Sequence, residues 1–239
     1  MKSQILTLFS IDSDPSTLHS IHVNPLKKSH QFFKFYVDKE SLLSVFEPLI
    51  FQIKSNSAPR TLILCQTRKQ TAFLYQRFAC ELDSHLYKNR DGNTKERKVE
   101  MFHGGTPDQV KSHIVDDMSK SDGVVTVLIC TNAFGMGVNC KDVTQVIHFG
   151  PSKTIENYIQ ECGRAGRNGS VSKCILYYNG VLSANISNEM RNYCFSNSVC
   201  LRKCLDGLFG QDTNYEFAGC ACCGFCLNIC DCEGPHQHS

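Results

Sequence analysis

The chain has 239 residues, enough for one full domain and a small appendage. Its hydrophobic content of 41% and charged content of 20% are typical of a folded globular protein, and its net charge of +2 excludes a strongly basic DNA-coating protein. No stretch approaches the roughly 18 apolar residues of a transmembrane helix. The N-terminal run has no signal-peptide character, so an intracellular protein without membrane contact is expected.

The first 24 residues show no clear period and are interpreted as the end of an element that begins upstream. From residue 32 onward, alternating apolar positions indicate a strand, and later continuous apolar runs indicate strands buried on both faces. The predicted strands cover residues 33–37, 61–65, 99–102, 124–130, 143–149 and 171–178. The predicted helices cover residues 42–50, 73–82, 108–118, 154–162 and 183–205, and a charged loop is predicted over 84–98.

Strands that alternate with helices predict an α/β fold with a doubly wound, mostly parallel sheet. In such a sheet, ligand sites lie at the carboxyl ends of the strands. The unusual loops of this chain fall at those ends, among them CQTR at 65–68, HGG at 103–105 and TNAFGMGVN at 131–139. The basic run at 95–98 is interpreted as a solvated loop.

Cysteine is unusually frequent, with 15 in the chain and eight of them between residues 200 and 232. Without a secretory signal, such a cluster predicts a metal site rather than a disulfide framework. Three thiolates of a C-x-x-C-x-x-C run and a fourth on the preceding helix would satisfy a tetrahedral zinc ion. The predicted ligands are Cys200, Cys220, Cys223 and Cys226. The surplus cysteines are Cys204, Cys222, Cys230 and Cys232.

The segment QECGRAGRNG at 160–169 carries two arginines that are three residues apart. An apolar stripe on its helix faces the core, which leaves Gln160, Arg164 and Arg167 pointing elsewhere. Two arginines at a helix end suit a multiply charged anion such as the γ-phosphate of a nucleotide. The alternative interpretation is a pair of solvated surface arginines.

Together, the motifs at 131–139 and 160–169 resemble the C-terminal half of RecQ-type DNA helicases over roughly residues 25–230. Asn168 stands where that family has an acidic residue. The resemblance implies a remnant of a first RecA-like lobe at 1–24, a second RecA-like lobe at 25–180 and a zinc-binding module at 181–239.

The resemblance also implies roles for individual residues. Arg167 and Arg164 would reach ATP and its Mg²⁺ across a cleft between two lobes, while Gln160 would couple the nucleotide to DNA. Gly135 and Gly137 would permit a tight loop beside the nucleotide. The DNA backbone would be contacted by Thr67, Arg68, His103 and Thr131. For Arg68, a helix-start residue without DNA contact is the open alternative.

Two motifs of a complete helicase are missing from the sequence: no glycine is followed by lysine, and no aspartate by glutamate. A P-loop and an acidic Mg²⁺ motif are therefore absent. We expect the C-terminal portion of an ATP-dependent 3′–5′ DNA helicase for repair or recombination, inactive until a first lobe is supplied in cis or in trans, and nuclear if eukaryotic. The alternatives are a non-catalytic module that binds DNA or a partner, and a zinc-dependent adaptor with decayed lobes.

Overall fold

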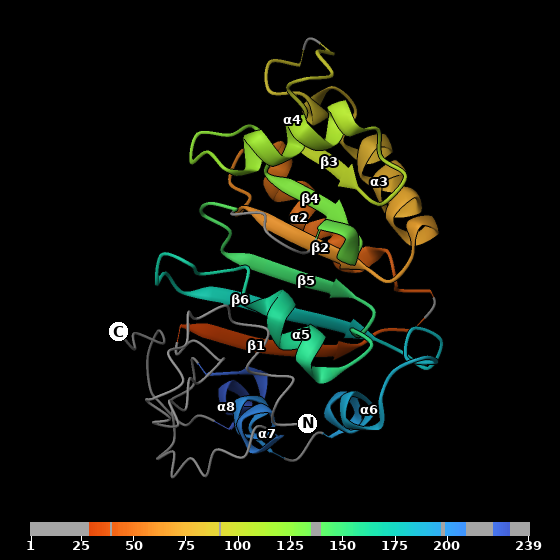
Figure 1. Cartoon of the computed structure of the whole chain (residues 1–239), viewed down its shortest axis with the longest axis vertical. Helices are drawn as coiled ribbons and strands as arrows, with labels where there is room; N and C mark the ends of the chain where they lie inside the picture. Colours follow the sequence, from red (N-terminus) through yellow and green to blue (C-terminus); the bar gives the residue numbers. More distant parts are fainter. Residues whose placement is uncertain are drawn as a thin grey trace, which may run out of the picture.

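The structure is a computed structural model that describes residues 29–38, 40–90, 92–134, 140–196, 199–208 and 222–229. Within these ranges, six strands form one parallel sheet in the order β1-β6-β5-β2-β4-β3 (Figure 1). The strands are β1 (His30–Tyr36), β2 (Thr61–Cys65), β3 (Val99–Phe102), β4 (Val127–Cys130), β5 (Gln145–Phe149) and β6 (Ser172–Tyr178). The helices are α2 (Glu47–Lys54), α3 (Arg68–Leu82), α4 (Asp108–Met118), α5 (Ile155–Cys162), α6 (Asn188–Phe195), α7 (Leu201–Leu208) and α8 (Gly224–Asn228), and the short 3₁₀ turns are η1 (Ser44–Phe46), η2 (Asp83–Leu86) and η3 (Asn132–Phe134).

The middle of the sheet consists of strands without a water-facing side. Every residue of β2 and β4 is buried, and Ile63 stands opposite Ile129 on one side and Ile147 on the other. A parallel strand with helices over both faces favours an unbroken run of Leu, Ile and Val. The predicted α/β fold with a doubly wound parallel sheet is therefore confirmed.

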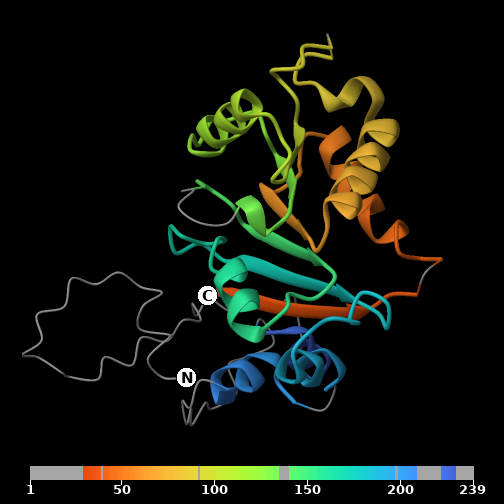
Figure 2. The ribbon, with the colours of Figure 1, turned by 45° about the vertical axis from the view of Figure 1, so that its right-hand side comes forward.

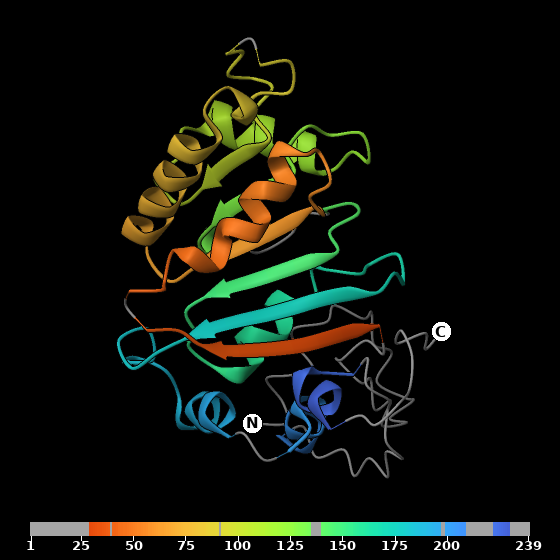
Figure 3. The same cartoon turned by 180° about the vertical axis from the view of Figure 1, so that it is seen from behind.

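Helices cover the two faces of the sheet. Figure 3 shows α2 and α3 over one face, and Figure 1 shows α4 and α5 over the other. In the first layer, the ring of Phe46 lies 5.7 Å from that of Phe78 and 5.6 Å from that of Phe149. In the second, Phe102 and Phe134 meet edge to face at 4.9 Å. This last contact fixes the turn η3 against β3, because such aromatic pairs add about 1 kcal/mol beyond their burial.

The C-terminal helices pack beyond the edge strand β1 (Figure 2). Their core is continuous with that of β1, β6 and α5, and it includes Phe32, Tyr158 and Leu205, all fully buried. The backbone N–H of Phe32 donates to the carbonyl of Cys222 at 3.3 Å, and Phe32 forms a parallel bridge with Cys223. The cysteine segment is thus attached directly to the sheet.

The single helix predicted over 183–205 is wrong, because the structure has two helices, α6 and α7, in that region. The reason is visible at the end of α6, where Ser196 has an extended backbone with ψ 120°. The ammonium of Lys34 donates to the carbonyls of Tyr193 at 2.6 Å and Cys194 at 3.1 Å, and also to that of Ser196. A lysine that satisfies the last carbonyls of a helix ends it favourably.

Three other sequence expectations have different outcomes. The predicted charged loop at 84–98 contains the turn η2 and an antiparallel bridge between Tyr87 and Arg97. The predicted first-lobe remnant at 1–24 lies outside the described residues. The boundary between 180 and 181 stays a prediction, although one buried core extends across it.

Arg60 is hydrogen-bonded to the loops that precede the central strands, and its replacement should be strongly destabilising. Its guanidinium donates to the carbonyls of Val125 at 3.2 Å and Asp117 at 3.1 Å, and it lies 3.5 Å from the Asp117 carboxylate. Arg60→Met would remove the cation and its donors, and the Asp117 carboxylate would keep only the bonds from the Val124 and Val125 N–H groups. We therefore expect the free energy of unfolding to fall by about 3 kcal/mol in urea denaturation. Arg77→Met, which removes an exposed pair with Glu81, should change it by less than about 1 kcal/mol. Equal losses for the two variants would contradict this role of Arg60.

Candidate functional site

Three site loops emerge at one edge of the sheet. The strands β2, β4 and β3 are neighbours and run in parallel, so their carboxyl ends lie side by side (Figure 1). The predicted nucleic-acid contacts Thr67, Arg68, His103 and Thr131 directly follow these strands. The structure therefore brings all four residues to the same edge.

Thr67 and Arg68 begin helix α3 in a fixed geometry. The Thr67 hydroxyl accepts a bond from the Gln70 N–H at 3.1 Å, and the Gln70 side chain accepts from the Thr67 N–H at 3.1 Å, which is a capping box. Arg68 is exposed, and its guanidinium extends over the turn at Gly104, where an added Cβ would meet Nη2 at 2.8 Å. The sequence alternative of a helix-start residue is correct for the position of Arg68. Its side chain nonetheless lies toward the neighbouring loop.

His103 uses its ring nitrogen Nδ1 within its own turn, which leaves Nε2 for other contacts. Its Nδ1 accepts a bond from the Gly105 N–H at 3.0 Å, and its own backbone N–H donates to Thr106 Oγ1 at 3.0 Å. Because Nδ1 is an acceptor here, the neutral ring carries its proton on Nε2. This half-buried imidazole is therefore oriented as a hydrogen-bond donor beside Arg68, which suits a phosphate oxygen.

Thr131 has an internal role in this structure. It is 6% exposed, its Oγ1 accepts a bond from the Ala133 N–H at 3.4 Å, and its carbonyl accepts from the Phe134 N–H at 3.1 Å. These bonds shape the turn η3. Gly135 and Gly137, which the sequence places next to the nucleotide, lie outside the described residues.

The three predicted residues of the 160–169 segment are placed differently. Gln160 and Arg167 are exposed, whereas Arg164 is only 7% exposed. The Arg164 guanidinium donates from Nη1 to the carbonyl of Phe134 at 3.3 Å. In this conformation Arg164 joins the segment to the turn η3, and Arg167 is the exposed arginine of the two. Nucleotide contact by either arginine stays a prediction.

Sequence reasoning missed a buried hydrogen-bonded contact between β5 and α5. His148 Nε2 lies 3.0 Å from the Glu161 carboxylate, and the Ser152 hydroxyl donates to the same oxygen. His148 is 1% exposed, and the centre of its ring lies 4.8 Å from that of Tyr158, with the two rings tilted by 51°. A polar residue inside the apolar strand 145–149 was the available signal, because a buried histidine requires a partner.

The Glu161 carboxylate should make stability depend on pH. Burial raises its pKa, but the bonds from His148 and Ser152 outweigh burial and hold the pKa below the ordinary value of 4.5. A lowered folded-state pKa contributes stability that is present above 4.5 and is lost as pH falls through the folded value. Glu161→Gln should therefore lower the melting temperature at pH 7, and the difference from wild type should shrink below about pH 4.5.

Thermal melts between pH 3.5 and 8 test this expectation, and Glu156→Gln, an exposed change on the same helix, is the control. Because wild type and variant are compared at each pH, titrating groups that do not contact Glu161 cancel. A difference for Glu161→Gln that is constant across this range would show that its charge contributes nothing.

Four cysteines form a compact cluster between α7, α8 and β1. The sulfur atoms of Cys200, Cys222, Cys223 and Cys226 lie within 4.8 Å of one another, with 3.6 Å between Cys200 and Cys222 and 3.9 Å between Cys200 and Cys223. Four thiolates about 2.3 Å from a tetrahedral zinc ion would be about 3.8 Å apart. The cluster could therefore hold zinc with little rearrangement. It includes three of the four predicted ligands, and Cys220 lies outside the described residues.

The environment of Cys223 favours a thiolate. The neighbouring thiols of Cys200 and Cys222 lower its pKa. The backbone N–H groups of Leu201 at 3.4 Å and Cys226 at 3.5 Å also donate to its sulfur. By contrast, burial raises the pKa of Cys226 to about 12. A metal ion would replace that proton, because thiols bind metals as thiolates.

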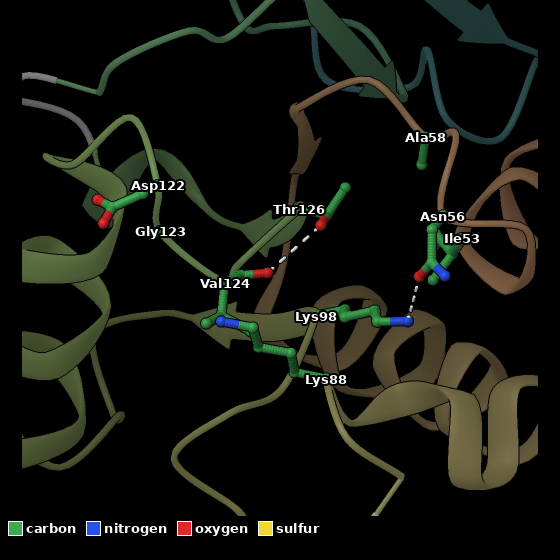
Figure 4. A pocket seen from close by; sticks show the side chains of 9 residues that line it. All are labelled: Ile53, Asn56, Ala58, Lys88, Lys98, Asp122, Gly123, Val124 and Thr126. Carbon is green, nitrogen blue, oxygen red and sulfur yellow. Dashed lines mark hydrogen bonds between the residues drawn. The ribbon is translucent and has the colours of Figure 1, made fainter.

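One pocket lies away from these groups. It is a cavity of about 210 Å³ beside the start of β3 and β4, lined by Lys88, Lys98, Asn56 and Thr126 among others (Figure 4). The Lys98 ammonium donates to the Asn56 side chain at 2.7 Å. The cavity is smaller than the roughly 300 Å³ of ordinary ligand pockets, and it faces the edge opposite the site loops.

Comparison with known proteins agrees with this geometry. The chain matches the helicase conserved C-terminal domain over residues 41–169. The chain belongs to this family. ATP-dependent DNA helicase Q1 of Mus musculus is 34% identical over 142 residues, which cover 54% of this chain and 21% of that protein. RecQ-like DNA helicase blm-1 of Caenorhabditis elegans is 35% identical over 133 residues, which cover 47% of this chain and 13% of that protein.

These relatives confirm the RecQ-type resemblance, and the match spans about a fifth or less of their length. Solved structures show the same fold. Dbp5 of S. cerevisiae bound to RNA and ADP BeF3 has a TM-score of 0.57 at 20% identity and covers 81% of this chain and 46% of its own. Domain 2 of the DEAD-box helicase Mss116p bound to an RNA duplex has a TM-score of 0.51 at 21% identity and covers 69% of this chain and 58% of its own.

Within the described ranges, no helix is long and apolar enough to cross a membrane.

Proposed function

We propose that this chain provides the second motor lobe of an ATP-dependent DNA helicase of RecQ type with 3′–5′ polarity, acting in repair or recombination. The observation that carries the proposal is the bond between Arg164 and the Phe134 carbonyl. It joins the 131–134 turn to the 160–169 segment at one place and leaves Arg167 exposed beside them. An arginine in this position supports phosphoryl transfer by stabilising transition-state charge.

The chain's own residues have separable tasks in this proposal. Arg68 and the Nε2–H of His103 would hold a phosphodiester backbone without reading its bases. Arg167 would approach the γ-phosphate of ATP when a first lobe, supplied in cis or in trans, closes over the nucleotide. Bound Mg²⁺ would neutralise charge on the phosphates. Its ligands and the P-loop lysine would belong to the first lobe, since the 239 residues contain neither motif.

The cysteine cluster supports a structural zinc in the same proposal. Three protein ligands and an open position characterise catalytic zinc, whereas four thiolates make a closed structural site. Cys200, Cys223 and Cys226 would each bind the ion, with either Cys220 or Cys222 as the fourth ligand. The ion would hold α7 and α8 against β1, beside the lobe that carries the arginines.

The 239-residue chain should bind single-stranded DNA weakly and in a salt-dependent manner. Phosphate contacts release counterions, so the affinity should fall steadily as salt rises. Arg68→Ala removes one such cation and should weaken binding roughly three-fold or more and reduce the salt slope by about 1. Fluorescence anisotropy with a labelled oligonucleotide at several salt concentrations measures both quantities.

Arg77→Ala is the matched control, because Arg77 lies further along the same helix and pairs with Glu81. Identical effects of the two substitutions would exclude a specific role for Arg68. Binding that shows base preference and no salt dependence would contradict the helicase proposal. It would favour a recognition module.

A further inference from the structure

The side chain of Gln66 connects the nucleic-acid edge to two neighbouring loops. Its Nε2 donates to the carbonyl of Pro151 at 2.7 Å and to that of Leu182 at 2.8 Å. Both N–H groups of the amide are thereby used. Gly150 has φ +96°, and a Cβ there would lie 2.8 Å from Gln66 Cδ. Only glycine gives both this backbone conformation and the room for the Gln66 amide.

The contacts continue from this loop into helix α5. Ser152, the residue after Pro151, donates its hydroxyl to the Glu161 carboxylate. The backbone carbonyl of Glu161 accepts a bond from the Arg164 N–H at 3.2 Å. Arg164 in turn donates to the Phe134 carbonyl at 3.3 Å. An unbroken series of bonds therefore runs from the residue before Thr67 to the loop that carries Arg167.

The middle of this series is shielded from water. Ser152 is 9% exposed, Arg164 is 7% exposed and His148, which supports Glu161, is 1% exposed. Hydrogen bonds in such surroundings are stronger than at the surface and are not readily exchanged for bonds to water. Packed interiors also transmit small displacements rather than absorb them. A shift of the 66–68 segment would therefore displace the residues at the carboxyl end of α5.

We propose that Gln66, Ser152 and Glu161 form a relay that repositions the loop at 163–169 when a nucleic-acid backbone binds at Arg68. This inference rests on the proposed function, because it requires an anionic strand at that edge. The three residues are positioning residues, and none of them touches DNA or nucleotide. Coupling through such a network requires a direct test, because contiguity alone does not establish it.

The test uses Gln66→Met in the full 239-residue chain, with a single-stranded oligothymidylate as the probe. Methionine keeps the volume of glutamine and removes the two donors. In wild type, the oligonucleotide should slow amide hydrogen exchange several-fold in the peptide covering 163–169. In Gln66→Met, the oligonucleotide affinity should stay within roughly two-fold of wild type while that slowing is lost.

The control is Gln76→Met, which makes the same change at an exposed position of α3 and should keep the slowing. Ser152→Ala interrupts the series at a second point, and its loss of slowing would support the relay even if Gln66→Met folds poorly. Slowing that persists in both relay variants would overturn the relay and leave the helicase proposal intact. Absence of oligonucleotide binding by wild type would overturn both. A ten-fold loss of affinity in Gln66→Met would show a direct contact instead of a relay.

Discussion

Chelation of the proposed zinc ion from the reduced protein is expected to unfold the segment that carries α7 and α8. Structural zinc in small modules supplies on the order of 10 kcal/mol of apparent binding free energy, far more than a single side-chain contact. The loss should extend into the shared core, because Phe32 and Leu205 pack in the same cluster as Cys223 and Cys226. Circular dichroism during chelation measures this loss of structure, and metal analysis beforehand measures the zinc content. Reduced protein with well under one equivalent of zinc would contradict a structural site.

Cysteine variants separate ligands from neighbours. Cys226→Ser should lose the bound zinc and the helical signal of the C-terminal segment, because three thiolates hold zinc less tightly than four. Cys204→Ser is the matched control, since Cys204 packs against the same core without belonging to the compact cluster. The pair Cys220→Ser and Cys222→Ser decides the fourth ligand. Retention of zinc by Cys226→Ser would show that the cluster is not the metal site.

A second large effect is expected on the rate of ATP hydrolysis. The isolated 239-residue polypeptide should show no measurable turnover, with or without DNA, because the groups that hold Mg²⁺ and the phosphates are absent from its sequence. Adding a first lobe in trans, or fusing it upstream, should produce DNA-stimulated hydrolysis. In that assembly, Arg167→Ala should lower kcat by roughly three orders of magnitude while DNA affinity stays nearly unchanged.

Arg164 provides an informative comparison for this experiment. Arg164→Ala should lower the melting temperature more than Arg167→Ala does, because Arg164 is buried and loses its bond to the Phe134 carbonyl, whereas Arg167 is exposed. DNA-stimulated turnover by the isolated chain that disappears in Arg167→Ala would refute the requirement for a first lobe. Lack of turnover with the first lobe present would favour a non-catalytic binding module.

The sheet was predictable from the sequence because its strands leave a simple signal. The runs 61–65 and 99–102 match β2 and β3 residue for residue. For β2 the reason is that a strand buried on both faces favours a continuous apolar run. The helices after the last strand were less predictable. The break between α6 and α7 depends on Lys34, more than 150 residues away in the chain, and no local pattern records such a contact.

The candidate site was predictable as a set of loops but not as a set of side-chain orientations. Spacing placed Arg164 and Arg167 at the end of one helix, yet only the fold shows that one is buried and the other exposed. The partnership of Glu161 with His148 was missed because it joins a helix to a strand, and helical periodicity describes each element alone. The choice between Cys220 and Cys222 likewise depends on how the chain folds around the ion.

The bond between the Phe32 N–H and the Cys222 carbonyl also affects whether the edge strand β1 can pair with another molecule. β1 is one of the two edge strands of the sheet, and an edge strand with free backbone groups can pair with a strand of another molecule. Exposed aromatic side chains at Phe35 and Tyr36 would strengthen such pairing. Because the cysteine segment occupies part of this edge, we expect it to hinder the addition of a strand from another molecule. Metal binding would in this way reduce aggregation through β1 and also stabilise the fold.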